Sequence, residues 1–264
     1  MLGRLSRPPA GTLQAFPWRE WRDEFERARH CGFDCLEWLV TAERVDENPI
    51  WTAAGVQEIR GLSDRTGVKV TSICADSFIA NPFVRVSEAE RDASLARLGA
   101  LVRQAAAAGI RTIAVPVIEH GELRTPLEGA RLVAALSGPL EEAGRLGVRV
   151  GLECDWPGDR LRSLLESASQ PLFAYYDVGN ARARGHDPAR DIAALGDRLC
   201  GVHIKDRTVN GPSVALGAGD VDVAAAIAAL DAAGYDGPLI LETPAGADPI
   251  ASAKKNRSFV TSRL

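Results

Sequence analysis

The sequence of 264 residues is poor in cysteine and has no excess of basic residues. Its five cysteines form no Cys-x-x-Cys pair, which argues against both a disulfide framework and a structural zinc site. The 31 lysines and arginines are outnumbered by 35 aspartates and glutamates, so no basic field attracts nucleic acid or an acidic membrane. No apolar run approaches the roughly 20 residues of a membrane helix, and the first residues lack the apolar stretch of a signal peptide. These absences predict a cytoplasmic protein with no nucleic-acid or membrane partner.

Short β-branched runs alternate along the chain with longer amphipathic stretches. The runs predict strands at 34–39, 68–73, 111–116, 148–153, 172–177, 199–204 and 238–242, with a further short strand at about 2–5. The stretches between them predict helices at about 18–31, 52–66, 88–108, 127–146, 159–169, 188–197, 222–233 and 248–262. Glycine stands between several of these helices and the next strand, where a C-terminal cap favours a left-handed residue.

Strict alternation of strand and helix implies a parallel sheet. Eight strand–helix units close into an α/β fold, the (β/α)8 TIM barrel, and we expect one such domain over residues 1–264. An open, doubly wound sheet is the structural alternative. The stretches 40–50 and 205–220 are long enough to be functional loops after strands.

The candidate site follows from the residues that end the strands, because a barrel carries its active site at the carboxyl ends of its strands. Four consecutive predicted strands end in Glu153, Asp177, His203 and Glu242. Each alone is more commonly a loop cap or a hydrogen-bonded core residue. Together, three carboxylates at one barrel mouth would repel one another unless a cation compensated them. Carboxylates with an imidazole and no thiolate suit Mn²⁺, Mg²⁺, Co²⁺ or a catalytic Zn²⁺.

The chain also resembles the xylose-isomerase-like superfamily of sugar and sugar-phosphate isomerases and epimerases. The similarity runs nearly end to end, through GRLS, QAFPWREW, GFDCLEW, SICAD, GLECDW, YYDVGNA, VHIKD, LGAGDVD and LETP. The branch it most resembles contains L-ribulose- and L-xylulose-5-phosphate 3-epimerases, with D-tagatose 3-epimerase as a wider relative. This resemblance implies a TIM barrel with one divalent metal ion, Mn²⁺ foremost, held by Glu153, Asp177, His203 and Glu242. It also implies a sugar or sugar-phosphate substrate, and relatives often form homo-oligomers.

The resemblance further implies that Glu153 and Glu242 form the acid/base pair of a ketose 3-epimerase or isomerase. Removing a proton next to a ketone leaves an enediolate, whose negative charge a neighbouring divalent cation stabilises. Two strands separate the two glutamates, so they would stand on opposite sides of the cation. One glutamate could then remove a proton from one face while the other returns a proton to the opposite face. That arrangement inverts a stereocentre without an organic cofactor.

Six residues are predicted to contact the substrate. Lys205 and Arg207 follow His203 and could bind a substrate oxygen or phosphate, although a salt bridge from Lys205 to Asp206 is an equal alternative. Asn180 stands where wider relatives often have a histidine that contacts substrate. The remaining three are Glu37, whose family counterpart reaches the sugar or organises the mouth, and Trp38 and Trp156, which could wall the pocket or simply pack.

Three of four other features have two interpretations each. Asp76 and His120 could support the site or lie on the surface, and Cys154 is expected to pack. The segment LGAGDVD (216–222) could be a phosphate-binding loop, or a turn in which Asp220 or Asp222 caps the next helix.

Three other functions remain as alternatives. A metal-dependent dehydratase of a cyclic keto-polyol, such as inosose or dehydroshikimate, needs the same base beside a ketone, so the sequence does not separate it from an epimerase. A nuclease resembling endonuclease IV would need many histidines, and this chain has four. A non-catalytic barrel is disfavoured by the intact set of four strand-end residues.

Overall fold

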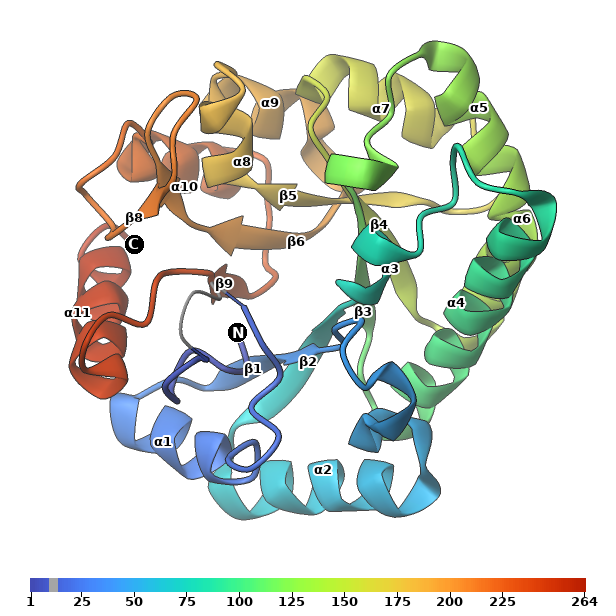
Figure 1. Ribbon diagram of the computed structural model, residues 1–264. Coiled ribbons are helices and arrows are strands. Elements are labelled where there is room, and N and C mark those ends of the chain that lie inside the picture. The colour runs from blue at the N-terminus through green and yellow to red at the C-terminus, as the bar shows by residue number, and fades with distance from the viewer. Residues whose placement is uncertain (10–13) are drawn as a thin grey trace.

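The computed structural model describes residues 1–9 and 14–264. A curved parallel sheet forms a nearly closed barrel, and helices surround it (Figure 1). Each strand lies within one residue of its predicted bounds, and the predicted barrel is confirmed over the open doubly wound sheet. In sheet order the strands are β1 (Cys35–Leu39), β2 (Lys69–Cys74), β3 (Thr112–Val117), β4 (Arg149–Cys154), β5 (Phe173–Asp177), β6 (Leu199–Ile204) and β9 (Leu239–Leu241).

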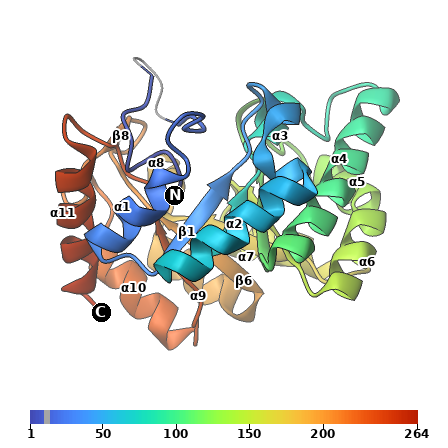
Figure 2. The same ribbon diagram turned by 90° about the horizontal axis from the view of Figure 1, so that it is seen from below.

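The helices follow the strands in sequence and cover the outside of the barrel (Figure 2). They are α1 (Asp23–Cys31), α2 (Ala53–Thr66), α3 (Ser77–Ala80), α4 (Glu88–Ala108), α5 (Pro126–Ala135), α6 (Ser137–Leu146), α7 (Gly158–Glu166), α8 (Val178–Ala183), α9 (Pro188–Leu195), α10 (Val223–Ala232) and α11 (Pro249–Thr261). Short 3-10 turns lie at Val45–Glu47, Pro49–Trp51, Glu119–Gly121 and Gly196–Arg198. None of the helices in the described part of the chain has the length and apolar character needed to cross a bilayer.

The prediction of one helix over 127–146 is wrong, because the structure divides this stretch into α5 and α6 at Leu136. Pro139 explains the break. A proline ring clashes with the carbonyl group four residues earlier, so a continuous helix through Ala135 would be interrupted here.

The prediction of a strand at 2–5 is also wrong, since these residues form turns and bends. The segment nevertheless lies between β9 and β1, where the first strand of an eight-stranded barrel would stand (Figure 1). The Leu2 N–H donates to the carbonyl of Glu37 at 2.9 Å, and the Met1 nitrogen lies 3.4 Å from the carbonyl of Leu241. Gly3 prevents an extended strand: its φ is 83°, and its N–H donates to the Glu24 carboxylate.

The loop after β6 is held in place by one buried carboxylate. Asp206 begins a short antiparallel ribbon of β7 (Asp206–Arg207) and β8 (Ser213–Val214). Its two oxygens accept hydrogen bonds from the N–H groups of Gly217, Gly219 and Val221 at 2.8, 3.0 and 3.1 Å. The segment LGAGDVD therefore binds a carboxylate of its own chain, and Asp222 at its end caps α10.

Replacing this carboxylate should destabilise the protein. We expect Asp206→Ala to lower the free energy of unfolding by about 3 kcal/mol, because three N–H groups lose their acceptor. For a chain of this size that corresponds to a fall in Tm of roughly 5–10 °C, measured by calorimetry or circular dichroism. Asp220→Ala is the control, because it removes a single exposed hydrogen bond to the Val209 N–H in the same loop. A fall in Tm no larger than that of the control would contradict the assigned role of Asp206.

Candidate active site

Neighbouring strands bring the four predicted strand-end residues together at one end of the barrel. Glu153 lies near the end of β4, Asp177 ends β5, and His203 lies opposite Asp177 in the β5–β6 register. Glu242 follows β9, and its N–H continues the ladder by donating to the carbonyl of Ile204. All four predicted residues are buried, with at most 6% of each residue exposed.

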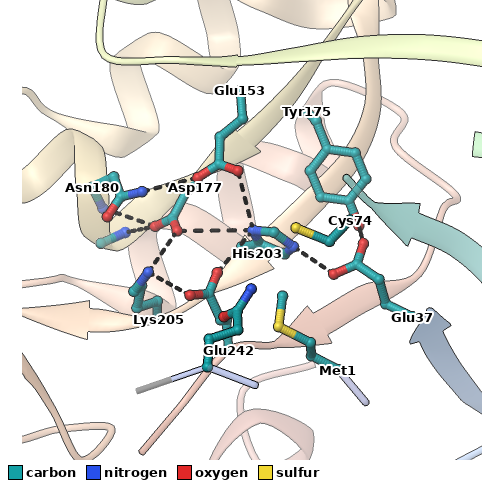
Figure 3. A network of polar contacts seen from close by, with 12 residues as sticks. Met1, Glu37, Cys74, Glu153, Tyr175, Asp177, Asn180, His203, Lys205 and Glu242 are labelled. Atoms are coloured by element: carbon teal, nitrogen blue, oxygen red, sulfur yellow. Dashed lines mark hydrogen bonds and ion pairs between the residues drawn. The ribbon is translucent and has the colours of Figure 1, made fainter. Parts of the chain in front are cut away.

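The imidazole of His203 stands at the centre of this group (Figure 3). Its Nδ1 lies 3.0 Å from Oε2 of Glu242, 3.9 Å from Oδ2 of Asp177 and 4.0 Å from Oε2 of Glu153. Nδ1 is buried and has no hydrogen-bond partner among the described residues. A buried nitrogen without a partner is costly, and here it faces three carboxylates that repel one another. Glu153, Asp177 and His203 offer ligand atoms close enough together to share one metal ion, and Glu242 adjoins them through its contact with Nδ1. This donor set fits a divalent cation, so we treat the four residues as a candidate metal site.

The other ring nitrogen of His203 is held by Glu37. Nε2 lies 2.8 Å from Oε2 of Glu37, while Oε1 of Glu37 accepts hydrogen bonds from the hydroxyls of Tyr175 and Ser72 at 2.5 and 2.8 Å. A proton on Nε2 would leave the lone pair of Nδ1 directed at the carboxylates, as in many histidine metal ligands. Glu37 was predicted to contact substrate, but it is fully buried behind His203 and both of its oxygens are engaged. It therefore positions His203.

Tyr175 was missed in the sequence, although a signal was present. It lies two residues before Asp177 on β5, and alternate residues of a strand point to the same face. The position of Asp177 thus already placed Tyr175 inside the barrel.

Lys205 is buried beside two of the carboxylates. Its Nζ lies 2.6 Å from Oε1 of Glu242 and 3.3 Å from Oδ2 of Asp177, so it does not form the salt bridge to Asp206 that was one alternative. Arg4, which the sequence did not indicate, also approaches Glu242, with Nη2 at 3.5 Å from Oε1. Two cations thus neighbour Glu242.

Asn180 and Arg207 connect Glu153 to the loop after β6. The amide nitrogen of Asn180 donates to Oε1 of Glu153 at 2.9 Å, and its amide oxygen accepts from Nη1 of Arg207 at 2.8 Å. Arg207 also donates to the carbonyl of Gly211. Both residues lie at the mouth, where the sequence placed them.

The two tryptophans lie away from the candidate site. Trp38 is fully buried, packs edge-on against Trp21 at 5.3 Å, and donates its indole N–H to Asn48. Trp156 donates its indole N–H to the carbonyl of Leu123 and is covered by the guanidinium of Arg160. Neither is among the described residues that line the cavity at the mouth. The structure therefore corrects both predictions: these side chains pack rather than wall the pocket.

The cavity beside the carboxylates of Glu153 and Glu242 has a volume of about 690 Å³. Glu153, Lys205 and Glu242 form its floor region, and Asp76 lines it as well. Asp76 is engaged by the Cys74 thiol and by the amide of Gln14, and burial raises its pKa to about 6. The cavity is therefore lined largely by polar side chains, which suits a ligand rich in hydroxyl groups.

The two glutamates have opposite pKa shifts. Burial raises the pKa of Glu153 well above its usual range. Burial acts on Glu242 in the same direction, but the Lys205 ammonium and His203 outweigh it and hold the pKa of this carboxyl well below its usual range. The surroundings of the two glutamates therefore differ, with the Lys205 ammonium beside Glu242 and the neutral Asn180 amide on Glu153.

A family model and several known proteins match nearly the whole length of this chain. A family model described as a xylose isomerase-like TIM barrel matches residues 25–263. The L-ribulose-5-phosphate 3-epimerase UlaE of Escherichia coli is 27% identical over 263 residues, covering 92% of this chain and 90% of its own. A solved L-ribulose 3-epimerase is 20% identical, covers 93% of this chain and 89% of its own, and has a TM-score of 0.75. The D-psicose 3-epimerase of Clostridium cellulolyticum is 15% identical, covers 93% and 94%, and has a TM-score of 0.74.

Proposed function

Because this chain belongs to the xylose isomerase-like TIM barrel family, as its sequence predicted, we propose that it is a metal-dependent sugar isomerase of the ketose 3-epimerase type. The observation that carries the proposal is the convergence of three buried carboxylates, from Glu153, Asp177 and Glu242, on Nδ1 of His203 at one end of the barrel. Its named relatives are epimerases, which supports the same reaction class.

The acid and base roles follow from the surroundings of each glutamate. Glu242, kept ionised by Lys205, would remove the proton from the carbon next to the ketone. Glu153 would return a proton from the other side, because β5 and β6 separate its strand from β9. Asn180 holds the Glu153 carboxyl in place through the bond to Oε1.

Glu153, Asp177, His203 and Glu242 would hold the cation, with Mn²⁺ the first candidate and Mg²⁺, Co²⁺ or Zn²⁺ the others. When bound, a divalent cation supplies stabilisation for the negative charge that proton removal places on the substrate oxygens. Lys205 and Arg207 would donate a remaining N–H to a substrate hydroxyl at the cavity wall while keeping their internal partners.

Proton exchange with solvent tests this function directly. Ketopentoses and ketohexoses would be incubated with the protein and Mn²⁺ in D₂O and followed by NMR. We expect deuterium to replace the proton at C3 and the C3 epimer to accumulate, and both should stop when a chelator is added. A product with new ultraviolet absorbance would instead indicate the dehydratase. Failure of every ketose and ketose phosphate to exchange, with metal bound, would refute the proposal.

A further inference from the structure

We propose that the site takes an unphosphorylated ketose or keto-polyol and discriminates against phosphate esters. This inference rests on the proposed function and specifies its substrate class. The named relatives include epimerases of a sugar phosphate and of free sugars, so the comparisons leave the class open. The structure bears on the question because the groups that could bind a phosphate are already engaged by the protein itself.

The glycine-rich segment beside the mouth is the first such group. Converging N–H groups of this kind often bind phosphate. Here Gly217, Gly219 and Val221 direct their N–H groups to the carboxylate of Asp206, which is 1% exposed. A phosphate would have to displace a buried anion to use them.

A second set of N–H groups converges just after β5. The N–H groups of Gly179 and Asn180 both donate to Oδ1 of Asp177 at 2.8 Å. These donors are the first of α8 and face the mouth, but they too are occupied by an internal carboxylate.

The basic side chains that line the cavity are engaged in the same way. Lys205 binds Asp177 and Glu242, as described above. Arg184 donates to Oδ2 of Asp155 from Nη2 and Nε at 2.6 and 3.0 Å. The side chain of Arg207 is bound by the Gly211 carbonyl and by Asn180. Residues 10–13, which lie outside the described part of the chain, contain no lysine or arginine in the sequence.

Three further carboxylates line the cavity outside the candidate metal site, at Asp76, Glu119 and Asp155. A phosphate dianion placed among them would meet the like charge of Asp76 and Glu119, while the charge of Asp155 is compensated by Arg184. Uncharged hydroxyl groups, in contrast, can donate hydrogen bonds to the same oxygens. The lining thus favours a polyol over its phosphate ester.

A matched pair of substrates tests the inference. The same NMR assay would compare L-ribulose with L-ribulose 5-phosphate, and calorimetry would compare their binding to the metal-loaded protein. We expect kcat/KM to be about 100-fold higher for the free sugar. Equal or better turnover of the phosphate ester would overturn the inference while leaving the proposed function intact. If neither compound turns over, the proposed function fails for this pair, and tighter binding of the phosphate ester would then overturn the inference as well.

One substitution should shift this preference. Asp155→Asn removes the negative charge that compensates Arg184 in the lining, so it should raise the relative kcat/KM for the phosphate ester about tenfold. Asp197→Asn is the matched control, because Asp197 also pairs with an arginine, Arg162, but is exposed at the surface. The control should leave the substrate ratio unchanged. An unchanged ratio in Asp155→Asn would count against the role assigned to the lining charges.

Discussion

Glu153→Gln and Glu242→Gln should each lower kcat to below about one thousandth of the wild-type value. Glutamine keeps the size and most hydrogen bonds of glutamate, but it cannot take up or release the proton that epimerisation moves. The amide oxygen of a glutamine at position 153 can still accept the hydrogen bond from Asn180, so the fold should survive. The measurement is C3 proton exchange at saturating ketose, with thermal unfolding as a check on structure.

The control for these two variants is Glu166→Gln, which alters an exposed glutamate paired with Arg162 at the end of α7. It should retain normal turnover. The two-glutamate scheme is wrong if either active-site variant keeps more than about a tenth of wild-type kcat while binding metal normally, because general acid/base catalysis contributes about 10²–10⁴-fold.

His203→Ala should abolish binding of the divalent cation. Elemental analysis of the purified wild-type protein should find about one Mn, Zn, Co or Mg per chain, and the variant should contain almost none, because the imidazole Nδ1 lies amid all three carboxylates. His30→Ala is the matched control, since His30 is exposed and contacts Lys254 on the outer surface. A wild-type protein that contains no metal and fails to bind added Mn²⁺ would remove the candidate metal site.

Glu37→Gln should weaken the binding of the divalent cation without abolishing it. Glu37 touches Nε2 of His203 and not the side of the ring that faces the carboxylates. We expect the affinity for Mn²⁺ to fall by about 10–100-fold rather than vanish, as for other groups that orient a metal-binding histidine. An unchanged affinity would show that the ring is held by packing against Tyr175 alone.

The strand-end rule located the site from sequence because it depends only on periodicity. Parallel strands of similar length end at the same level, so a polar residue at each end meets its neighbours. Asp177 and His203 are direct partners in the register, and the convergence on Nδ1 follows from it. The meeting of these four side chains therefore needed no information on loops, and their role as metal ligands stays a prediction.

The two kinds of error in the sequence predictions have different origins. The alternation within β1 already separates Glu37 from Trp38, since adjacent residues of a strand point to opposite faces. Glu37 faces the barrel interior, so Trp38 has to face the aromatic cluster outside it. The predicted strand at residues 2–5 failed for another reason. The positive φ of Gly3 prevents a strand there, and a short apolar run in the sequence does not reveal that conformation.

The attachment of the loop after β6 has a consequence for how new specificities arise in this scaffold. Asp206 holds Gly217, Gly219 and Val221 from inside the chain, and Arg207 holds the carbonyl of Gly211, so the loop is fixed at both of its ends and near its middle. Asn210 and Ser213 lie between these anchors and line the cavity. Substitutions at Ser213 can therefore explore new substrates at little cost in stability, provided that Asp206 is retained, whereas the positive φ of Asn210 favours asparagine or glycine at that position. Gene duplication followed by drift in the same few codons offers natural selection the same route.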